Sequence, residues 1–237
     1  MRTEDAFGYA LSSNQAWAGY KSHQNPDYFS KLASGQSPTI LWLGCSDSRC
    51  PETTILGLQP GDVFVHRNIA NIISPTDINT SAVIEYAVVH LKVKHVVLCG
   101  HSCCGGAVAA LSDNRVGGIL DMWLTPLRAV RNAHREELDA IVDQKERAIR
   151  IAELNVEAGI NVLMANASIQ EAIAERGLQV HGTLFDIGTG HMRDLGFGNG
   201  KGRHQNLRGM NDSASVVRGK HAMLVFGAGG AGEMLAL

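Results

Sequence analysis

The stretch Leu41–Arg49, L-W-L-G-C-S-D-S-R, ends an apolar run with a turn that carries a cysteine, an aspartate and an arginine. The stretch Cys99–Gly106, C-G-H-S-C-C-G-G, follows another apolar run and also holds potential metal ligands. The runs at residues 39–43 and 95–99 are short and partly β-branched, which is typical of strands buried on both faces of a parallel sheet. Parallel strands end at the same edge of a sheet, where open α/β folds bind their ligands. We therefore expect the two turns to lie close together.

Three side chains in these turns form a set of potential metal ligands. Cys45, His101 and Cys104 offer two thiolates and one imidazole, a donor set that suits zinc. Three protein ligands leave a fourth coordination position open, which is the arrangement of catalytic rather than structural zinc sites. Cys103 is the alternative to its neighbour, and the His-x-x-Cys spacing favours Cys104. The sequence therefore predicts a zinc enzyme with one zinc ion per chain.

An acidic and a basic residue, Asp47 and Arg49, lie just beyond the first of these ligands. Two thiolates cancel the charge of zinc, so a bound water is less acidified than at a site of three histidines and needs help to form hydroxide. Asp47 is placed to accept a hydrogen bond from that water, and Arg49 can keep Asp47 ionised by a bidentate contact. A surface ion pair of little energetic value is the alternative, and adjacency to a ligand disfavours it. Both residues are predicted to be catalytic.

Strand-like and helix-like segments alternate along the chain. Strands are predicted at 39–43, 63–66, 95–99 and 179–187, and helices at 3–20, from about residue 26, and at 51–58, 81–91, 107–111, 118–134, 136–166 and 168–176. This alternation predicts an α/β fold with a mostly parallel central sheet of about four or five strands flanked by helices. We expect residues 1–189 to form a single zinc-dependent domain and the glycine-rich residues 190–237 to form a mobile or irregularly packed tail.

Composition excludes several classes of protein. The chain has 237 residues, of which 45% are hydrophobic and 19% charged, as in an ordinary globular domain. A net charge of −2 provides no field that would attract nucleic acid or an anionic membrane. No apolar run reaches the length of a transmembrane helix, and the acidic first residues do not resemble a secretory signal. Five cysteines, three of them near the predicted metal site, favour a reducing compartment, so we predict a cytoplasmic protein.

The two turns resemble the motifs of the β-class carbonic anhydrases, C-x-D-x-R at Cys45–Arg49 and H-x-x-C at His101–Cys104. The similarity continues through the segment at 60–71, P-G-D-V-F-V-H-R-N-I-A-N, and covers residues 10 to 195. It implies that zinc is bound by Cys45, His101 and Cys104, and that zinc-bound hydroxide attacks carbon dioxide to give bicarbonate and a proton. It also implies a homodimer or an assembly of dimers, in which the N-terminal helices reach across to a partner subunit.

The same resemblance implies a substrate pocket. It places Gln36, Phe64, Ile69 and Tyr86 around carbon dioxide, some of them from the partner subunit. The backbone N–H of Gly105 could hold an oxygen of bicarbonate. Carbon dioxide is small and neutral, so apolar walls with one hydrogen-bond donor would suit it. Each of these side chains could equally serve in ordinary packing.

Two other functions compete with hydration of carbon dioxide. Some members of the family hydrolyse carbonyl sulfide or carbon disulfide, and the motif residues do not separate these activities. A non-catalytic zinc protein that binds bicarbonate would be expected to lack Asp47 or Arg49, and both are present.

A regulatory bicarbonate site occurs in some members of the family and uses a tryptophan, an arginine and a tyrosine. Trp42, Gly44 and Arg67 match it here, but Phe185 stands at the position of the tyrosine. The resemblance therefore implies little inhibition by bicarbonate.

Overall fold

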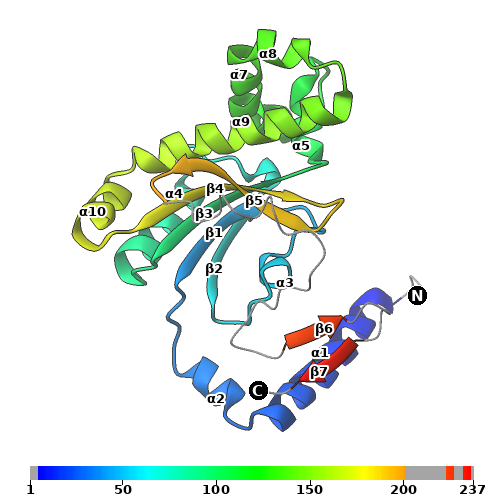
Figure 1. Ribbon diagram of the computed structural model, residues 1–237, viewed down its shortest axis with the longest axis vertical. Helices are drawn as coiled ribbons and strands as arrows, with labels where there is room; N and C mark the ends of the chain where they lie inside the picture. The colour runs from blue at the N-terminus through cyan, green and yellow to red at the C-terminus, as the bar shows by residue number, and fades with distance from the viewer. Residues whose placement is uncertain (1–4, 201–222, 227–231, 236–237) are drawn as a thin grey trace.

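A five-stranded sheet forms the centre of the computed structural model, which describes residues 5–200, 223–226 and 232–235 (Figure 1). Its strands are β1 (Ile40–Cys45), β2 (Val63–Asn68), β3 (His95–His101), β4 (Gln179–Asp186) and β5 (His191–Gly198), in the order β2-β1-β3-β4-β5. The first four strands are parallel, and β5 pairs antiparallel with β4. The predicted α/β fold with a mostly parallel sheet is therefore confirmed.

Helices flank the sheet on both faces. They are α1 (Ala6–Gln24), α2 (Tyr28–Ala33), α3 (Glu52–Leu56), α4 (Ile78–Glu85), α5 (Gly105–Leu111), α6 (Ile119–Trp123), α7 (Thr125–Ala133), α8 (Arg135–Ala140), α9 (Gln144–Met164) and α10 (Ala167–Arg176), with short helical turns η2 (Ile69–Asn71) and η3 (Tyr86–His90). Apolar side chains of α4, α9 and α10 pack on one face of the sheet. The short α3 packs on the other face.

The central strand β1 shows how the sequence builds this core. Leu41 and Leu43 point to the face covered by α9, whereas Trp42 points to the face covered by α3, because successive side chains of a strand alternate. All three are at most 2% exposed. Full burial of one such side chain contributes about 1.5–3 kcal/mol. The apolar run therefore forms a strand buried on both faces, which ends at Cys45.

A glycine on α9 lets this helix approach the sheet closely. A Cβ atom on Gly159 would lie 2.5 Å from Leu98 Cδ2 and 3.2 Å from Ile73 Cγ1. We expect Gly159→Ala to lower the free energy of unfolding by about 1–3 kcal/mol through overpacking, despite the higher helix propensity of alanine. Asn161→Ala, at an exposed position of the same helix, should change it by less than about 0.5 kcal/mol. Chemical denaturation at one protein concentration measures both variants, and a Gly159→Ala protein as stable as the unchanged chain would contradict this expectation.

The predicted helices at 81–91, 118–134 and 136–166 differ from the observed ones in their bounds. The first begins earlier, at α4, because the Asp77 carboxylate accepts the N–H of Asn79 (3.1 Å) and caps it. The second is divided into α6 and α7, because Pro126 starts a new helix more readily than it continues one. The third is divided into α8 and α9, where the Asp143 carboxylate accepts two backbone N–H groups (2.7 and 2.9 Å).

The edge strand β5 differs from the expectation of a tail that begins at residue 190. Residues 191–198 pair with β4 and complete the sheet, so the domain extends beyond residue 189. Most of β5 is exposed and it contains two glycines, so it lacks the apolar alternation that identifies a strand. Further along, β6 (Met223–Phe226) and β7 (Gly232–Leu235) form a separate antiparallel pair. Of the predicted tail, residues 201–222, 227–231 and 236–237 lie outside the described residues.

The N-terminal helices α1 and α2 lie apart from the layers around the sheet (Figure 1). No residue of α1 is buried. Its large apolar side chains are exposed, namely Phe7, Tyr9, Leu11, Trp17 and Tyr20. So many large apolar side chains exposed on one helix are uncommon on the surface of a monomer. Among the described residues, no helix is both long and apolar enough to cross a membrane.

Candidate active site

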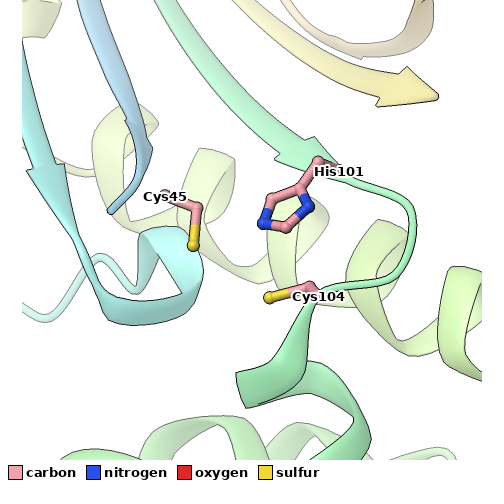
Figure 2. A group of neighbouring side chains, drawn as sticks. All are labelled: Cys45, His101 and Cys104. Atoms are coloured by element: carbon pink, nitrogen blue, oxygen red, sulfur yellow. The ribbon is translucent and has the colours of Figure 1, made fainter. Parts of the chain in front are cut away.

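Three potential metal ligands converge at the carboxyl edge of the sheet. Cys45 ends β1, His101 ends the neighbouring strand β3, and Cys104 immediately precedes α5. Their sulfur and nitrogen atoms all lie within 4.8 Å of one another, and the side chains point toward a common centre (Figure 2). The three residues are 8%, 2% and 4% exposed. The two turns thus meet at one sheet edge, as their place after parallel strands predicts.

The imidazole of His101 is oriented as a metal ligand. Its Nδ1 lies 2.9 Å from the carbonyl oxygen of Ser102. A carbonyl oxygen can only accept, so Nδ1 carries the proton and donates it. The other nitrogen, Nε2, is buried and has no hydrogen-bond partner among the described residues. A buried nitrogen with a free lone pair beside two thiols fits a soft divalent cation such as zinc.

One of the two thiols, Cys45, is prepared to lose its proton. The hydrogen bond from Cys104 lowers the pKa of Cys45 well below its usual range, although burial opposes this effect. The same interaction raises the pKa of Cys104, so the pair shares one proton. The backbone N–H groups of Gly106 and Ala107, in the first turn of α5, act to lower the pKa of Cys104. Binding of a cation between the sulfurs would replace the shared proton.

Asp47 and Arg49 form a two-pronged ion pair beside this group. Arg49 Nε donates to Asp47 Oδ1 (2.9 Å) and Nη2 donates to Oδ2 (2.7 Å), while the Arg49 backbone N–H donates to Oδ1 (3.0 Å). These bonds hold the pKa of Asp47 far below its usual range. The carboxylate Oδ2 lies 4.0 Å from His101 Nε2. An ionised acceptor therefore stands next to the potential metal ligands.

Arg49 also connects the two turns. Its Nη2 donates to the carbonyl oxygen of Cys103 (3.1 Å), 54 residues further along the chain. Cys103 has a left-handed backbone (φ 59°) and an exposed side chain, whereas the side chain of Cys104 is buried in the group. The structure thus brings Cys104 and not Cys103 to the other two ligands. Which of these two neighbouring cysteines joins the group depends on the local backbone conformation at Cys103.

The remaining cysteines, Cys50 and Cys99, lie in the apolar cluster on the α3 face with Trp42 and Phe185. Burial raises the pKa of Cys50 to about 11 and that of Cys99 to about 12, so both thiols stay protonated. This agrees with a role in packing. All five cysteines of the chain are free thiols.

Two of the predicted pocket residues lie near the metal-ligand group. Ile69 follows β2 and is 43% exposed, and its Cγ2 would lie 3.6 Å from a Cβ atom on Gly106. Gly105 begins α5, and a Cβ atom there would meet no atom within 4 Å. Open space therefore adjoins the Gly105 backbone, next to the ligand Cys104.

The other three pocket residues do not join the metal-ligand group of their own chain. Phe64 packs against Tyr86, with ring centroids 5.6 Å apart. Phe64 lies four residues before the end of β2, about 13 Å from the ligand edge at a rise of ~3.3 Å per residue. Gln36 precedes β1 and therefore lies toward the opposite edge of the sheet. Within one chain, Gln36 and Phe64 therefore lie away from the edge that carries the metal-ligand group, and Tyr86 lies with Phe64.

The turn η2 contains contacts that sequence reasoning missed. Ala70 and Asn71 both have left-handed backbones (φ 61° and 44°). Trp123 Nε1 donates to the Ile69 carbonyl (2.8 Å), and Asn155 Nδ2 donates to the Ala70 carbonyl (2.8 Å). These donors come from α6 and α9, so no local pattern in the sequence could identify them. They fix the backbone that carries Ile69.

The carboxyl edge of the mostly parallel sheet carries two thiols and a free imidazole nitrogen, and an ionised carboxylate lies beside them. This arrangement defines a zinc enzyme in which three protein ligands leave one coordination position open, as catalytic zinc sites do. A sequence model of the carbonic anhydrase family matches residues 40–192. The chain belongs to the β class of this family.

Individual relatives agree with this assignment. The chain is 48% identical over 186 residues to a carbonic anhydrase of Emericella nidulans, covering 78% of this chain and 81% of that protein. Its structure is similar to that of a tetrameric β-carbonic anhydrase from Sordaria macrospora, with 75% identity, a TM-score of 0.82 and coverage of 83% and 100% of the two chains. A β-carbonic anhydrase of Aspergillus fumigatus has 55% identity, a TM-score of 0.79 and coverage of 81% and 91%.

Proposed function

We propose that this chain catalyses the reversible hydration of carbon dioxide to bicarbonate and a proton, with one zinc ion held by Cys45, His101 and Cys104. The observation that carries the proposal is the buried ligand group, in which His101 Nε2 is free beside two thiols that share a proton. Zinc bound there supplies a Lewis acid that lowers the pKa of water. Membership of the family supports the same reaction.

Asp47 orients the attacking water by accepting a hydrogen bond from it. Arg49 engages both carboxylate oxygens, so Asp47 presents an ionised acceptor in one orientation. Because its pKa is lowered so far, Asp47 does not retain the proton released by the reaction at neutral pH. The proton therefore passes on to solvent buffer, and Asp47 serves as an orienting acceptor.

A second copy of the chain completes the substrate pocket in this proposal. Gln36, Phe64 and Tyr86 are distant from the metal group of their own chain, while Ile69 and Gly105 adjoin it. The exposed aromatic side chains of α1 offer a surface for a partner. The Sordaria macrospora relatives are tetrameric. We infer a homodimer or an assembly of dimers, and the five free cysteines support a cytoplasmic location.

Stopped-flow measurement of carbon dioxide hydration, on protein of known zinc content, tests the function. We expect turnover in proportion to bound zinc and its loss when a chelator removes the metal. Carbonyl sulfide and carbon disulfide are assayed in parallel. If the protein hydrolyses one of these two compounds and does not hydrate carbon dioxide, the proposed substrate is wrong. If zinc-loaded protein turns over none of these three substrates, the chain is a binding protein rather than an enzyme.

We expect this enzyme to show little inhibition by bicarbonate at a regulatory site. Phe185 is buried against Trp42 and lacks a hydroxyl for the anion. Arg67 Nε donates to the Cys45 carbonyl (2.8 Å), Nη2 donates to the Asp47 carbonyl, and Nη1 lies 3.7 Å from Glu52. The Arg67 guanidinium is therefore already bound by groups of the protein itself, which disfavours its binding bicarbonate.

The variant Phe185→Tyr tests this expectation. A restored hydrogen bond to a charged group would contribute about 1.5–3 kcal/mol, or about tenfold to a hundredfold in affinity. Bicarbonate inhibition is measured at matched pH in both proteins, and Phe185→Leu controls for the altered packing. Strong cooperative inhibition of the unchanged protein would contradict the assignment.

A further inference from the structure

Ser102, between the ligands His101 and Cys104, is anchored to the end of β4. It is 3% exposed. Its hydroxyl donates to Asp186 Oδ1 (2.8 Å) and accepts the N–H of Ile187 (2.9 Å). Its backbone N–H donates to the carbonyl of Phe185 (2.9 Å). Three hydrogen bonds therefore hold one residue of the ligand turn to a strand that supplies no ligand.

Asp186 is itself held in place. Its Oδ1 also accepts the N–H of Gly188 (3.0 Å), and its Oδ2 accepts the hydroxyl of Thr189 (2.8 Å). Hydrogen bonds from Thr189, Ser102 and Gly188 lower the pKa of Asp186, so the carboxylate is ionised at neutral pH. An ionised acceptor makes a stronger hydrogen bond to the Ser102 hydroxyl than a neutral one would.

The anchored residue presents the carbonyl that accepts His101 Nδ1–H (2.9 Å). Fixing this carbonyl fixes both the tautomer and the rotation of the imidazole, because the ring must keep its Nδ1–H on that oxygen. Partners of this kind behind a metal-ligating histidine set the basicity and the direction of the ligand nitrogen. The hydrogen bonds thus run from Asp186 through Ser102 to His101.

We propose that Ser102 and Asp186 are positioning residues that hold His101 Nε2 toward the metal and thereby set the affinity for zinc. The inference rests on the proposed zinc function. It assigns to the end of β4 a role in the metal site in addition to its role in the sheet. The competing explanation is that the same bonds only stabilise the junction between β3 and β4.

Zinc affinity and folding stability, measured separately, distinguish these explanations. Ser102→Ala and Asp186→Ala each remove the hydroxyl–carboxylate bond. We expect zinc binding to weaken by up to about tenfold, the lower end of the range typical when the outer partner of a metal-ligating histidine is itself lost, because the Ser102 carbonyl is kept in both variants. Asp186→Asn keeps an oxygen acceptor for Ser102 and should recover most of the affinity. Thr189→Val, which removes a bond to Asp186 without touching Ser102, is the matched control and should bind zinc as the unchanged protein does.

Affinity is measured on full-length protein by competition with a zinc chelator, and the thermal midpoint is measured on the zinc-free form of each variant. The imidazole nitrogen NMR shifts of His101 in zinc-free Ser102→Ala supply a second readout, and loss of the preference for Nδ1–H is expected. If both alanine variants bind zinc within about twofold of the unchanged protein, or if affinity simply follows the thermal midpoint in all four variants, the inference is wrong. Failure of the unchanged protein to bind zinc would instead contradict the proposed function.

Discussion

Replacement of Cys45, His101 or Cys104 by alanine is expected to remove zinc and to reduce carbon dioxide hydration to the uncatalysed background. Each change leaves only two of the three protein donors that the group offers, fewer than the three that hold zinc at a catalytic site. Zinc content by elemental analysis and turnover by stopped-flow measure the result on the same samples. This is the largest effect expected of any single substitution, because the whole reaction depends on the metal.

Cys103→Ala is the matched control for these variants. It removes a thiol adjacent in sequence to Cys104, but that thiol is exposed and lies outside the ligand group. The Cys103 carbonyl that accepts from Arg49 is retained. We expect full zinc content and near-normal turnover. Loss of zinc from Cys103→Ala together with its retention in Cys104→Ala would show that the ligand choice is wrong.

Asp47→Asn is expected to keep zinc and to lower kcat by about 10²–10³-fold, the typical effect of removing one preorganised polar group from a reaction centre. The amide has nearly the same shape, but it is neutral, and its nitrogen cannot accept the hydrogen bond. Arg49→Lys should lower kcat by at least about tenfold, because an ammonium cannot engage both Asp47 oxygens and the Cys103 carbonyl in the same geometry.

Zinc content separates a catalytic defect from a defect in metal binding in both variants. Arg115→Lys changes an exposed arginine that lies outside both ligand turns and pairs at 3.7 Å with Asp121, and it provides a control for loss of an arginine. Its turnover should be unchanged. Near-normal hydration by Asp47→Asn and Arg49→Lys at full zinc content would remove the ion pair from the mechanism.

Much of the fold could be predicted from local patterns. The runs that form β1 and β3 are apolar, short and bounded by turns, so their strand assignment followed from the residues themselves. The strand β5 could not be predicted in this way, because an exposed antiparallel edge needs no apolar face. The break between α8 and α9 could not be predicted either. Asp143 caps α9, but an aspartate inside a long helical pattern is a weak signal of a helix boundary in the sequence alone.

The substrate pocket was the least predictable part of the site. Phe64 and Tyr86 do contact each other, but Phe64 pairs with Leu41, toward the amino ends of the strands and away from the edge that carries the metal ligands. A single sequence carries no information on which residues of one copy face the site of another. Their role therefore stays a prediction, which the oligomeric state and the matching variants can test.

The sequence by itself determined the chemistry of the site, because the preference for zinc depends on the types of donor atom, and these are given by Cys45, His101 and Cys104. It also determined the ionised pair, since Asp47 and Arg49 lie two residues apart in one turn. The tertiary structure decided which thiol of Cys103 and Cys104 faces the group, through the left-handed backbone at the first of them. It alone brought Asp186 to Ser102, 84 residues away in the chain. Such contacts depend on the register of β3 and β4, which exists only once the two strands have paired.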